Sequence, residues 1–196
     1  MSGLNHRYPT YLLSLFILLS SGIALADSGI VLYGGYAQHR QEEMNDTNTY
    51  PTGTVYGAGF LMRKQFYELE FYAKQGSLSS DITHDNSKNT IEHDQLQVGA
   101  ALNFFFTKKF YARLGYSFAK IDQKFSKPMS IASEAGAKKE YGLLEEKLVD
   151  GLNIGAGYNI YSGTSVDFLI QYDFYYYNSI KANQSSVSVG IKYYLN

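Results

Sequence analysis

Apolar and polar residues alternate with a period of two in eight separate segments between residue 30 and the end of the chain. In the clearest segment, one face carries Val166, Phe168, Ile170, Tyr172, Phe174 and Tyr176, and the other carries Asp167, Gln171 and Asp173. This pattern is typical of a β-strand whose two faces meet unlike environments. Within 196 residues, eight such strands predict an all-β chain with one organising core.

The eight predicted strands have the length needed to cross a membrane. A tilted transmembrane strand needs about 9–11 residues, and the segments lie close to residues 30–38, 55–64, 66–74, 95–104, 110–120, 148–158, 166–176 and 186–195. Tight turns at 64–65, 107–109 and 161–164 alternate with longer polar loops at 38–54, 75–91, 121–147 and 178–185. Because this asymmetry is typical of membrane barrels, we expect an eight-stranded antiparallel up-and-down transmembrane β-barrel.

Composition agrees with this fold class. The chain has 19 Tyr and 12 Phe but 3 Pro, a mixture that favours strands. A soluble eight-stranded barrel of the lipocalin type is the structural alternative, since it has the same strand order. The small residues favour the membrane, because they fall largely on the polar face, where a narrow interior leaves little room: they are Gly57, Gly59, Gly99, Gly115, Gly155, Gly157 and Gly190.

Aromatic residues gather at both ends of the predicted strands. Beside the short turns lie Phe104 to Phe106, Phe110, Tyr111, Tyr158, Tyr161 and Tyr193, and toward the long loops lie Tyr36, Tyr56, Phe118 and Tyr175 to Tyr177. Two such bands are typical of the aromatic girdles that mark the two membrane–water interfaces.

The first 26 residues have the organisation of a secretory signal peptide. His6 and Arg7 precede an apolar run at 11–19, and Ala24-Leu25-Ala26 has the form that signal peptidase requires. The run is shorter than the roughly 20 residues of a membrane-spanning helix. We therefore expect residues 1–26 to be a signal peptide and residues 27–196 to be the barrel domain. Cysteine is absent, which excludes disulfides and thiolate metal sites and suits export through an oxidising periplasm.

The charges are nearly balanced, with 17 basic and 18 acidic residues, so non-specific binding of nucleic acid is not expected. Eight charges fall on the predicted interior face: Arg63, Lys74, Arg113 and Lys192, and Glu68, Glu70, Asp167 and Asp173. In a narrow interior these charges must pair, because an isolated buried ion is very costly. Their balanced signs favour a plugged, non-conducting interior over an ion pathway.

The sequence offers little for catalysis or for cofactor binding, and we predict no catalytic, cofactor or metal residues. A lipid A deacylase needs a Ser activated by a His near the bilayer surface, whereas His39, His84 and His93 lie in or beside the predicted loops without a paired Ser. Tyr177-Asn178-Ser179 offers a hydroxyl without a base. The group His84, Asp85, Glu92, His93 and Asp94 contains metal-ligand types, but a solvated hairpin turn explains it more simply.

Several short motifs resemble strands of the small outer-membrane barrels typified by OmpX and Ail. They are Gly34-Gly35-Tyr36-Ala37-Gln38, Gly155-Ala156-Gly157, Ser165-Val166-Asp167-Phe168 and Ser188-Val189-Gly190-Ile191-Lys192-Tyr193. In strand order and loop placement, the likeness covers nearly all residues after 26. It implies a Gram-negative outer-membrane location, contact with lipid and lipopolysaccharide, and assembly by the outer-membrane machinery. The assembly signal would be Ile191, Tyr193 and Leu195, with Leu195 in place of the family's usual terminal aromatic and Asn196 after it.

Some members of that family are linked to adhesion to host cells, invasion and resistance to complement. The resemblance therefore implies a barrel whose four extracellular loops bind a host-surface or matrix ligand, and together with the balanced interior charges we expect it to be monomeric and non-conducting. The third loop is long and of mixed charge, which suits a protein or the phosphates of lipopolysaccharide. A lipid A-modifying barrel enzyme and a purely structural outer-membrane protein are the alternative functions.

Overall fold

The computed structural model describes residues 27–41, 50–84, 87–132, 138–141 and 143–195, so the predicted signal peptide lies outside the described residues. The strands are β1 (Asp27–Gln41), β2 (Thr52–Lys64), β3 (Tyr67–His84), β4 (Ser87–Phe105), β5 (Phe110–Phe125), β6 (Met129–Ala132), β7 (Lys138–Tyr141), β8 (Leu144–Ser162), β9 (Val166–Tyr177) and β10 (Ala182–Leu195). A short 3-10 helix, η3, spans Asn178–Ile180. In this part of the chain no helix is long and apolar enough to cross a membrane.

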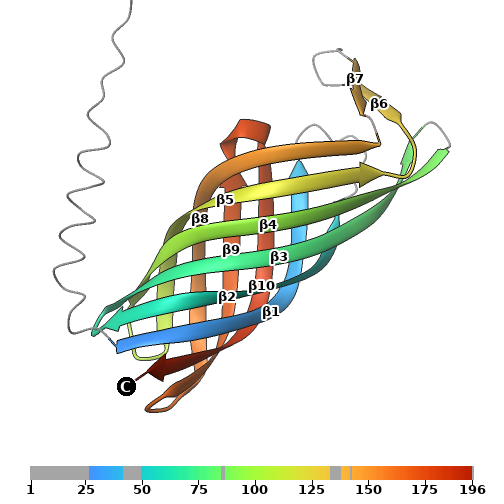
Figure 1. Ribbon diagram of the computed structural model, residues 1–196. Coiled ribbons are helices and arrows are strands. Elements are labelled where there is room, and N and C mark those ends of the chain that lie inside the picture. The colour runs from blue at the N-terminus through green and yellow to red at the C-terminus, as the bar shows by residue number, and fades with distance from the viewer. Residues whose placement is uncertain (1–26, 42–49, 85–86, 133–137, 142, 196) are drawn as a thin grey trace, which may run out of the picture.

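Eight strands close into one barrel in the order β1-β10-β9-β8-β5-β4-β3-β2, and every neighbouring pair is antiparallel (Figure 1). The remaining two strands, β6 and β7, form a separate hairpin between β5 and β8. Closure occurs where β1 pairs with β10, from Ser28 opposite Leu195 to Gln41 opposite Ala182. Because the ring is closed, no barrel strand is left with an unpaired edge. The predicted eight-stranded up-and-down barrel is confirmed.

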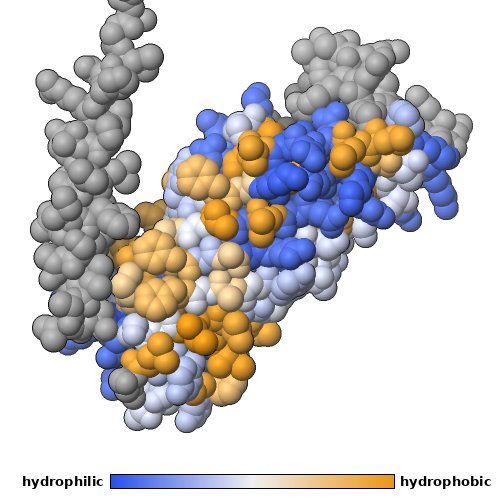
Figure 2. Space-filling view, viewed as in Figure 1, coloured by the Kyte–Doolittle hydropathy of each residue, from blue (hydrophilic) through white to orange (hydrophobic). Residues whose placement is uncertain are grey.

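The two faces of the barrel wall are chemically opposite. On β8, Leu152 and Ile154 point outward and are exposed, whereas Asn153 between them points inward and is fully buried. The same alternation on the other strands produces an outer apolar band, and in Figure 2 the hydrophobic residues gather toward the end of the barrel with the short turns. A surface of this kind suits the hydrocarbon of a bilayer, in which apolar side chains face outward and polar ones face the lumen.

The interior is too narrow for side chains at every inward position. A Cβ atom at Gly157 on β8 would collide with the ring of Tyr111, which is fully buried and donates a hydrogen bond to Gln171 Oε1 at 2.8 Å. Gly157 thus lets the Tyr111 side chain of β5 lie over β8 and reach Gln171 on β9. This contact gives a physical reason for glycine on the inward face of β8.

The long strands extend further than the sequence pattern predicts. Residues 75–91 were expected to form a loop, but β3 continues to His84 and β4 begins at Ser87. Likewise β5 continues to Phe125, β8 begins at Leu144, and the segment between them contains the β6–β7 hairpin. The loop expected at 178–185 is reduced to residues 178–181, because β10 begins at Ala182. These strand ends project beyond the apolar band, where the outward positions are polar and the alternation is no longer visible.

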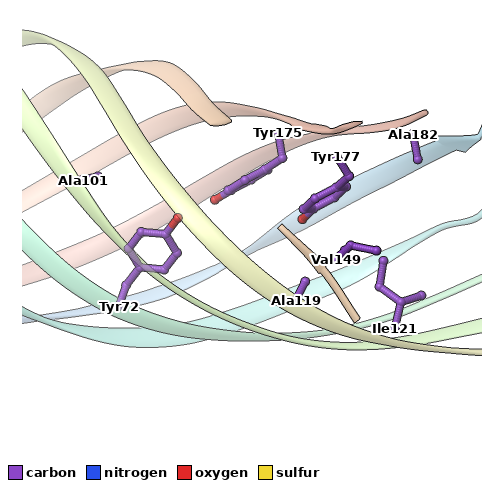
Figure 3. Close-up of a cluster of buried hydrophobic side chains, with 8 residues drawn as sticks. All are labelled: Tyr72, Ala101, Ala119, Ile121, Val149, Tyr175, Tyr177 and Ala182. Carbon is purple, nitrogen blue, oxygen red and sulfur yellow. The ribbon is translucent and has the colours of Figure 1, made fainter. Parts of the chain in front are cut away.

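A layer of aromatic and aliphatic side chains fills the lumen above its charged part (Figure 3). The rings of Tyr175 and Tyr177 are stacked, with centroids 6.3 Å apart and planes at 8°. The prediction that both tyrosines belong to an outer aromatic girdle is wrong, as it is for Tyr111, since all three side chains are inside the barrel. These tyrosines occupy the alternate strand positions whose side chains point into the barrel. Their large rings fill space that the glycines leave open.

Candidate functional site

The lower part of the lumen, near the short turns, contains two ion pairs. Lys192 contacts Glu68 at 2.6 Å, and both side chains are fully buried. Arg63 Nη1 contacts Asp167 Oδ2 at 3.1 Å and also donates a hydrogen bond to the Tyr194 hydroxyl at 2.9 Å. Tyr194 in turn donates to Glu68 at 3.0 Å. One continuous polar network thus joins strands from opposite ends of the chain.

A second network lies above the first. Arg113 contacts two carboxylates, Glu70 at 2.5 Å and Asp173 at 3.1 Å, and all three side chains are fully buried. Lys74 contacts the same Asp173 at 2.8 Å, and the Tyr33 hydroxyl donates a hydrogen bond to Glu70. All eight charges that the sequence placed on the interior face lie inside the barrel, and each contacts an opposite charge.

Neutral polar partners complete these networks, and sequence reasoning did not single them out. Asn103 donates to Glu68 at 2.9 Å, Asn159 donates to Asp167 at 3.1 Å, and Gln171 donates to Asp173 at 2.7 Å. Buried carboxylates need such donors, because one cation rarely satisfies all of their lone pairs. Gln171 alternates in phase with Asp167 and Asp173 on β9, and Asn103 and Asn159 lie on the inward, polar face of β4 and β8, so the period-two pattern is the signal that could have found them.

The predicted assembly residues Ile191, Tyr193 and Leu195 share the outward face of β10 and are exposed there. This position leaves them accessible from the lipid side of the barrel. Their role in assembly stays a prediction.

Two of the three histidines placed in or beside loops are instead inside the barrel. His39 lies on β1 and His93 lies on β4, each 1% exposed, and their ring centroids are 4.1 Å apart. Since Glu92 and Asp94 flank His93 on the outward face, the alternation separates His93 from these carboxylates. The described residues contain no group of three or more His, Cys, Asp or Glu side chains that could hold a metal ion. Asp85 lies outside the described residues.

The histidine pair lies above the apolar band, in the part of the barrel that projects beyond the membrane. The outward neighbours of His39 are Gln38 and Arg40, and those of His93 are acidic. Burial lowers the pKa of His39 to about 4; the neighbouring Gln184 side chain opposes this shift, and the Lys147 ammonium adds to it. Burial, the facing His39 ring and Lys147 together hold the pKa of His93 well below its usual value. Both imidazoles are therefore neutral at physiological pH.

The low pKa of His39 predicts an acid-dependent loss of stability. Between pH 6.5 and pH 4 the unfolded chain binds a proton at His39 that the folded barrel does not bind, so folding stability falls as the pH falls through this window. We expect His39→Gln to remove about 3 kcal/mol of this pH dependence. Unfolding in urea, measured in detergent and metal-free buffer at pH 7 and pH 4, tests it. Equal pH dependence in variant and wild type would contradict the burial of the imidazole.

The projecting strands carry a continuous polar surface on their outer side, which we call the platform. Its described residues are Gln75, Ser77, Ser79, Asp81, Lys88, Thr90, Glu92, Asp94, Lys120, Asp122, Lys124 and Glu146. Ser77 and Lys124 donate to Asp94 at 2.9 and 3.0 Å, and these hydrogen bonds lower the pKa of Asp94. The partners lie on three neighbouring strands, so cross-strand pairs fix the side chains on a hydrogen-bonded sheet.

Comparison with solved structures identifies the architecture. Ail, the attachment invasion locus protein of Yersinia pestis, superposes with a TM-score of 0.51 and 11% identity, over 87% of this chain and 99% of Ail, in its crystal structure with the heparin analogue sucrose octasulfate. This chain has the fold of a small outer-membrane barrel. Neisserial surface protein A gives a TM-score of 0.49 and 12% identity over 86% of this chain and 97% of its own. No family model and no curated protein matches the sequence.

In an outer-membrane barrel, short turns face the periplasm and long loops face the exterior. Both described ends of the chain, Asp27 and Leu195, lie on the side of the short turns, since β1 and β10 pair there. This rule predicts that the platform and the histidine pair lie at the extracellular end and that the ion networks lie within the membrane-spanning part.

Proposed function

We propose that this outer-membrane barrel binds a protein ligand at the cell surface through the platform, as an adhesion or attachment protein. The observation that carries the proposal is the projection of β3, β4, β5 and β8 beyond the apolar band as paired sheet (Figure 1). A purely structural barrel needs strands only as long as the membrane is thick. An ordered polar sheet held outside the membrane instead presents fixed side chains to a partner.

The charge of the platform indicates the chemistry of that partner. Its carboxylates are Asp81, Glu92, Asp94, Asp122 and Glu146, and its ammonium groups are Lys88, Lys120 and Lys124. Two of the lysines are already paired, since Lys120 contacts Asp122 at 3.1 Å and Lys124 contacts Asp94 at 3.0 Å. The excess of negative charge favours a host-surface or matrix protein with a basic surface. It disfavours a polyanion such as the heparin analogue bound to Ail.

Exchange of platform charges tests this proposal. Glu92→Lys combined with Glu146→Lys reverses two outward charges that are not part of the barrel interior, so we expect attachment of expressing bacteria to host cells or matrix proteins to fall to background. Lys109→Glu at a periplasmic turn is the matched control and should attach like wild type. Heat-modifiable migration on gels shows that each variant is folded. If the double variant attaches as well as wild type, or if wild type attaches to nothing, the proposal fails.

The same barrel is proposed to be non-conducting. Its lumen is crossed by buried ion pairs, and the aromatic layer of Tyr72, Tyr175 and Tyr177 lies above them. Eight strands leave an interior that side chains fill. We expect no conductance steps from the purified protein in a planar bilayer at salt concentrations at which porins conduct. Stable stepwise currents that scale with the amount of folded barrel would contradict a plugged lumen.

An enzyme that modifies lipid A is the second candidate, and the geometry supports it less. Catalysis by an activated Ser needs a His in hydrogen-bond reach of the hydroxyl. Among the described residues no serine hydroxyl is hydrogen-bonded to His39 or His93, and both rings face the lumen rather than lipid. Unchanged lipid A acylation on expression is therefore expected, and an altered acylation pattern would favour the enzyme.

A further inference from the structure

The projecting part of β8 has a neighbouring strand on one side only. β5 pairs with β8 up to Leu144, whereas the pairing with β9 stops at Gly151, opposite Tyr177. Beyond Tyr177 the chain turns in η3 and returns as β10. Within the ring every strand has two neighbours, but above it no described strand pairs with Leu144–Asp150 on the side away from β5 (Figure 1). We call Leu144–Asp150 the edge segment.

The hydrogen bonds to β5 show which backbone groups of β8 point to the open side. Along an antiparallel strand, the N–H and C=O groups of successive residues point to opposite neighbours. The Asn159 N–H donates to the Lys109 carbonyl at 2.8 Å, and the Leu143 carbonyl accepts from the Phe125 N–H at 3.0 Å, so the odd-numbered residues of β8 face β5. The β5–β8 register has no shift between these two positions. The even-numbered residues therefore direct their N–H and C=O groups to the open side: Leu144, Glu146, Leu148 and Asp150.

The outward side chains of the edge segment include two leucines that lipid does not cover. Leu148 is 83% exposed, the largest exposed fraction of any large hydrophobic residue described, and Leu144 is also exposed. They lie opposite Lys120 and Lys124 of the platform, above the apolar band. Glu146 lies between them and contacts Lys120 at 3.6 Å. Exposed apolar side chains mark interaction sites, and an open strand edge is a template for another strand.

We propose that an extended segment of the protein ligand adds to β8 as a further strand, hydrogen-bonded along the edge segment. This inference rests on the proposed function, because it names the way in which the projecting sheet holds its partner. In strand addition the main-chain hydrogen bonds supply affinity, and contacts with alternate side chains supply specificity. The edge segment is long enough for this, since an average strand has about 5–6 residues.

The outward face of the edge segment specifies the chemistry of the ligand strand. Side chains directly opposite one another on paired strands interact, and successive outward positions of β8 present leucine, glutamate, leucine and aspartate. The Asp150 carboxylate already accepts a hydrogen bond from the Tyr116 hydroxyl, so Glu146 is the main charge. The inward Glu145 and Lys147 have opposite signs and favour neither charge. A strand with apolar residues opposite the leucines and Lys or Arg opposite Glu146 therefore fits, which agrees with a basic partner.

A synthetic peptide tests the pairing directly. The probe has about eight residues, with valine and lysine in turn at every second position and threonine between them. Fluorescence anisotropy of the labelled peptide, titrated with the folded, detergent-solubilised barrel, measures its affinity. We expect saturable binding, together with protection of the edge-segment amides from hydrogen exchange. The same peptide with N-methylated amides keeps its charge but cannot pair, and it should bind at least roughly tenfold more weakly.

Leu148→Pro separates the backbone of the edge from its side chains. Proline removes the N–H that Leu148 directs to the open side and leaves the hydrogen bonds to β5 in place, which is where strands tolerate it. We expect it to weaken peptide binding roughly tenfold. Leu148→Ala keeps the N–H and should retain more affinity than Leu148→Pro. Val149→Pro is the matched control, because it removes an N–H that faces β5 and should lower the stability of the barrel instead. Heat-modifiable migration shows which variants are folded.

Three results would overturn strand addition. These are equal binding of the parent and N-methylated peptides, equal weakening by Leu148→Pro and Leu148→Ala, and dimers of the purified barrel that pair through the edge segment without peptide. The comparison of peptides uses the wild-type barrel, so it does not depend on whether a variant folds.

Attachment of bacteria separates this inference from the proposed function. If Glu92→Lys/Glu146→Lys abolishes attachment while Leu148→Pro attaches like wild type, strand addition is wrong and the platform proposal stands. If wild-type bacteria attach to nothing, both are wrong.

Discussion

Arg113→Met is expected to lower the free energy of unfolding of the barrel by about 3–5 kcal/mol, the largest effect of any single change in the lumen. Arg113 contacts Glu70 at 2.5 Å and Asp173 at 3.1 Å, and the variant leaves Glu70 without its guanidinium partner. A buried carboxylate without a cation must accept a large desolvation cost or bind a proton. The midpoint and slope of urea unfolding in detergent micelles, followed by tyrosine fluorescence, measure the effect.

Lys124→Met is the matched control for this experiment. It removes an ion pair of similar length, 3.0 Å to Asp94, but both partners are about half exposed. Such pairs contribute about 0–1 kcal/mol, because solvent already screens them. In the double variant Arg113→Met/Glu70→Gln, stability should partly recover, since the unpaired carboxylate is gone. Equal effects of Arg113→Met and Lys124→Met would show that the lumen charges are hydrated rather than buried.

Ile154→Arg is expected to destabilise the barrel in lipid bilayers by about 2–4 kcal/mol. Ile154 is 54% exposed on the outward face of β8, where a transmembrane barrel presents it to hydrocarbon. A charge at this depth must leave water for lipid, which is the costliest position on the wall of the barrel. Unfolding in urea from vesicles, compared with wild type in the same lipid, gives the magnitude.

Glu146→Arg provides the control on the same face of the same strand, eight residues away and above the apolar band. A surface substitution of this kind should change stability by no more than about 0.5 kcal/mol. The contrast between the two positions locates the edge of the membrane along β8. If Ile154→Arg were as harmless as Glu146→Arg, the outer apolar band would face water, and the soluble alternative would have to be reconsidered.

The strand order and the orientation of each face follow from the sequence, because period-two alternation is a local signal. Every second residue from Val166 to Tyr176 is apolar or aromatic, and the structure has β9 at Val166–Tyr177. The ends of the projecting strands do not follow from it. Beyond the membrane Ser77 and Ser79 are outward and polar, and Leu78 is the isolated inward apolar residue between them. A strand that faces water on one side, and that has both polar and apolar residues on the inward side, has the same sequence pattern as a loop.

The sequence predicts which residues face the interior of the barrel, but not which of them contact one another. The alternation along each strand places Lys192 and Glu68 inside the barrel. Their contact, however, joins residues 124 positions apart and depends on how the whole barrel closes. The histidines show the same limit more strongly. His39 and His93 have the inward parity of their strands, yet polar neighbours on both sides suggested loops. Their contact across the lumen depends on the barrel radius, which no single segment specifies.

The pairing of Ser28 with Leu195 also sets an order of events in folding. Contacts between the two ends of a chain carry the largest loop-closure cost, so they form late and slowly. Until β10 is present, β1 exposes a hydrogen-bonding edge to any other strand in reach, and an unfinished copy has the same exposed edge permanently. The last strand to be synthesised is therefore the one that ends the period of greatest risk of aggregation.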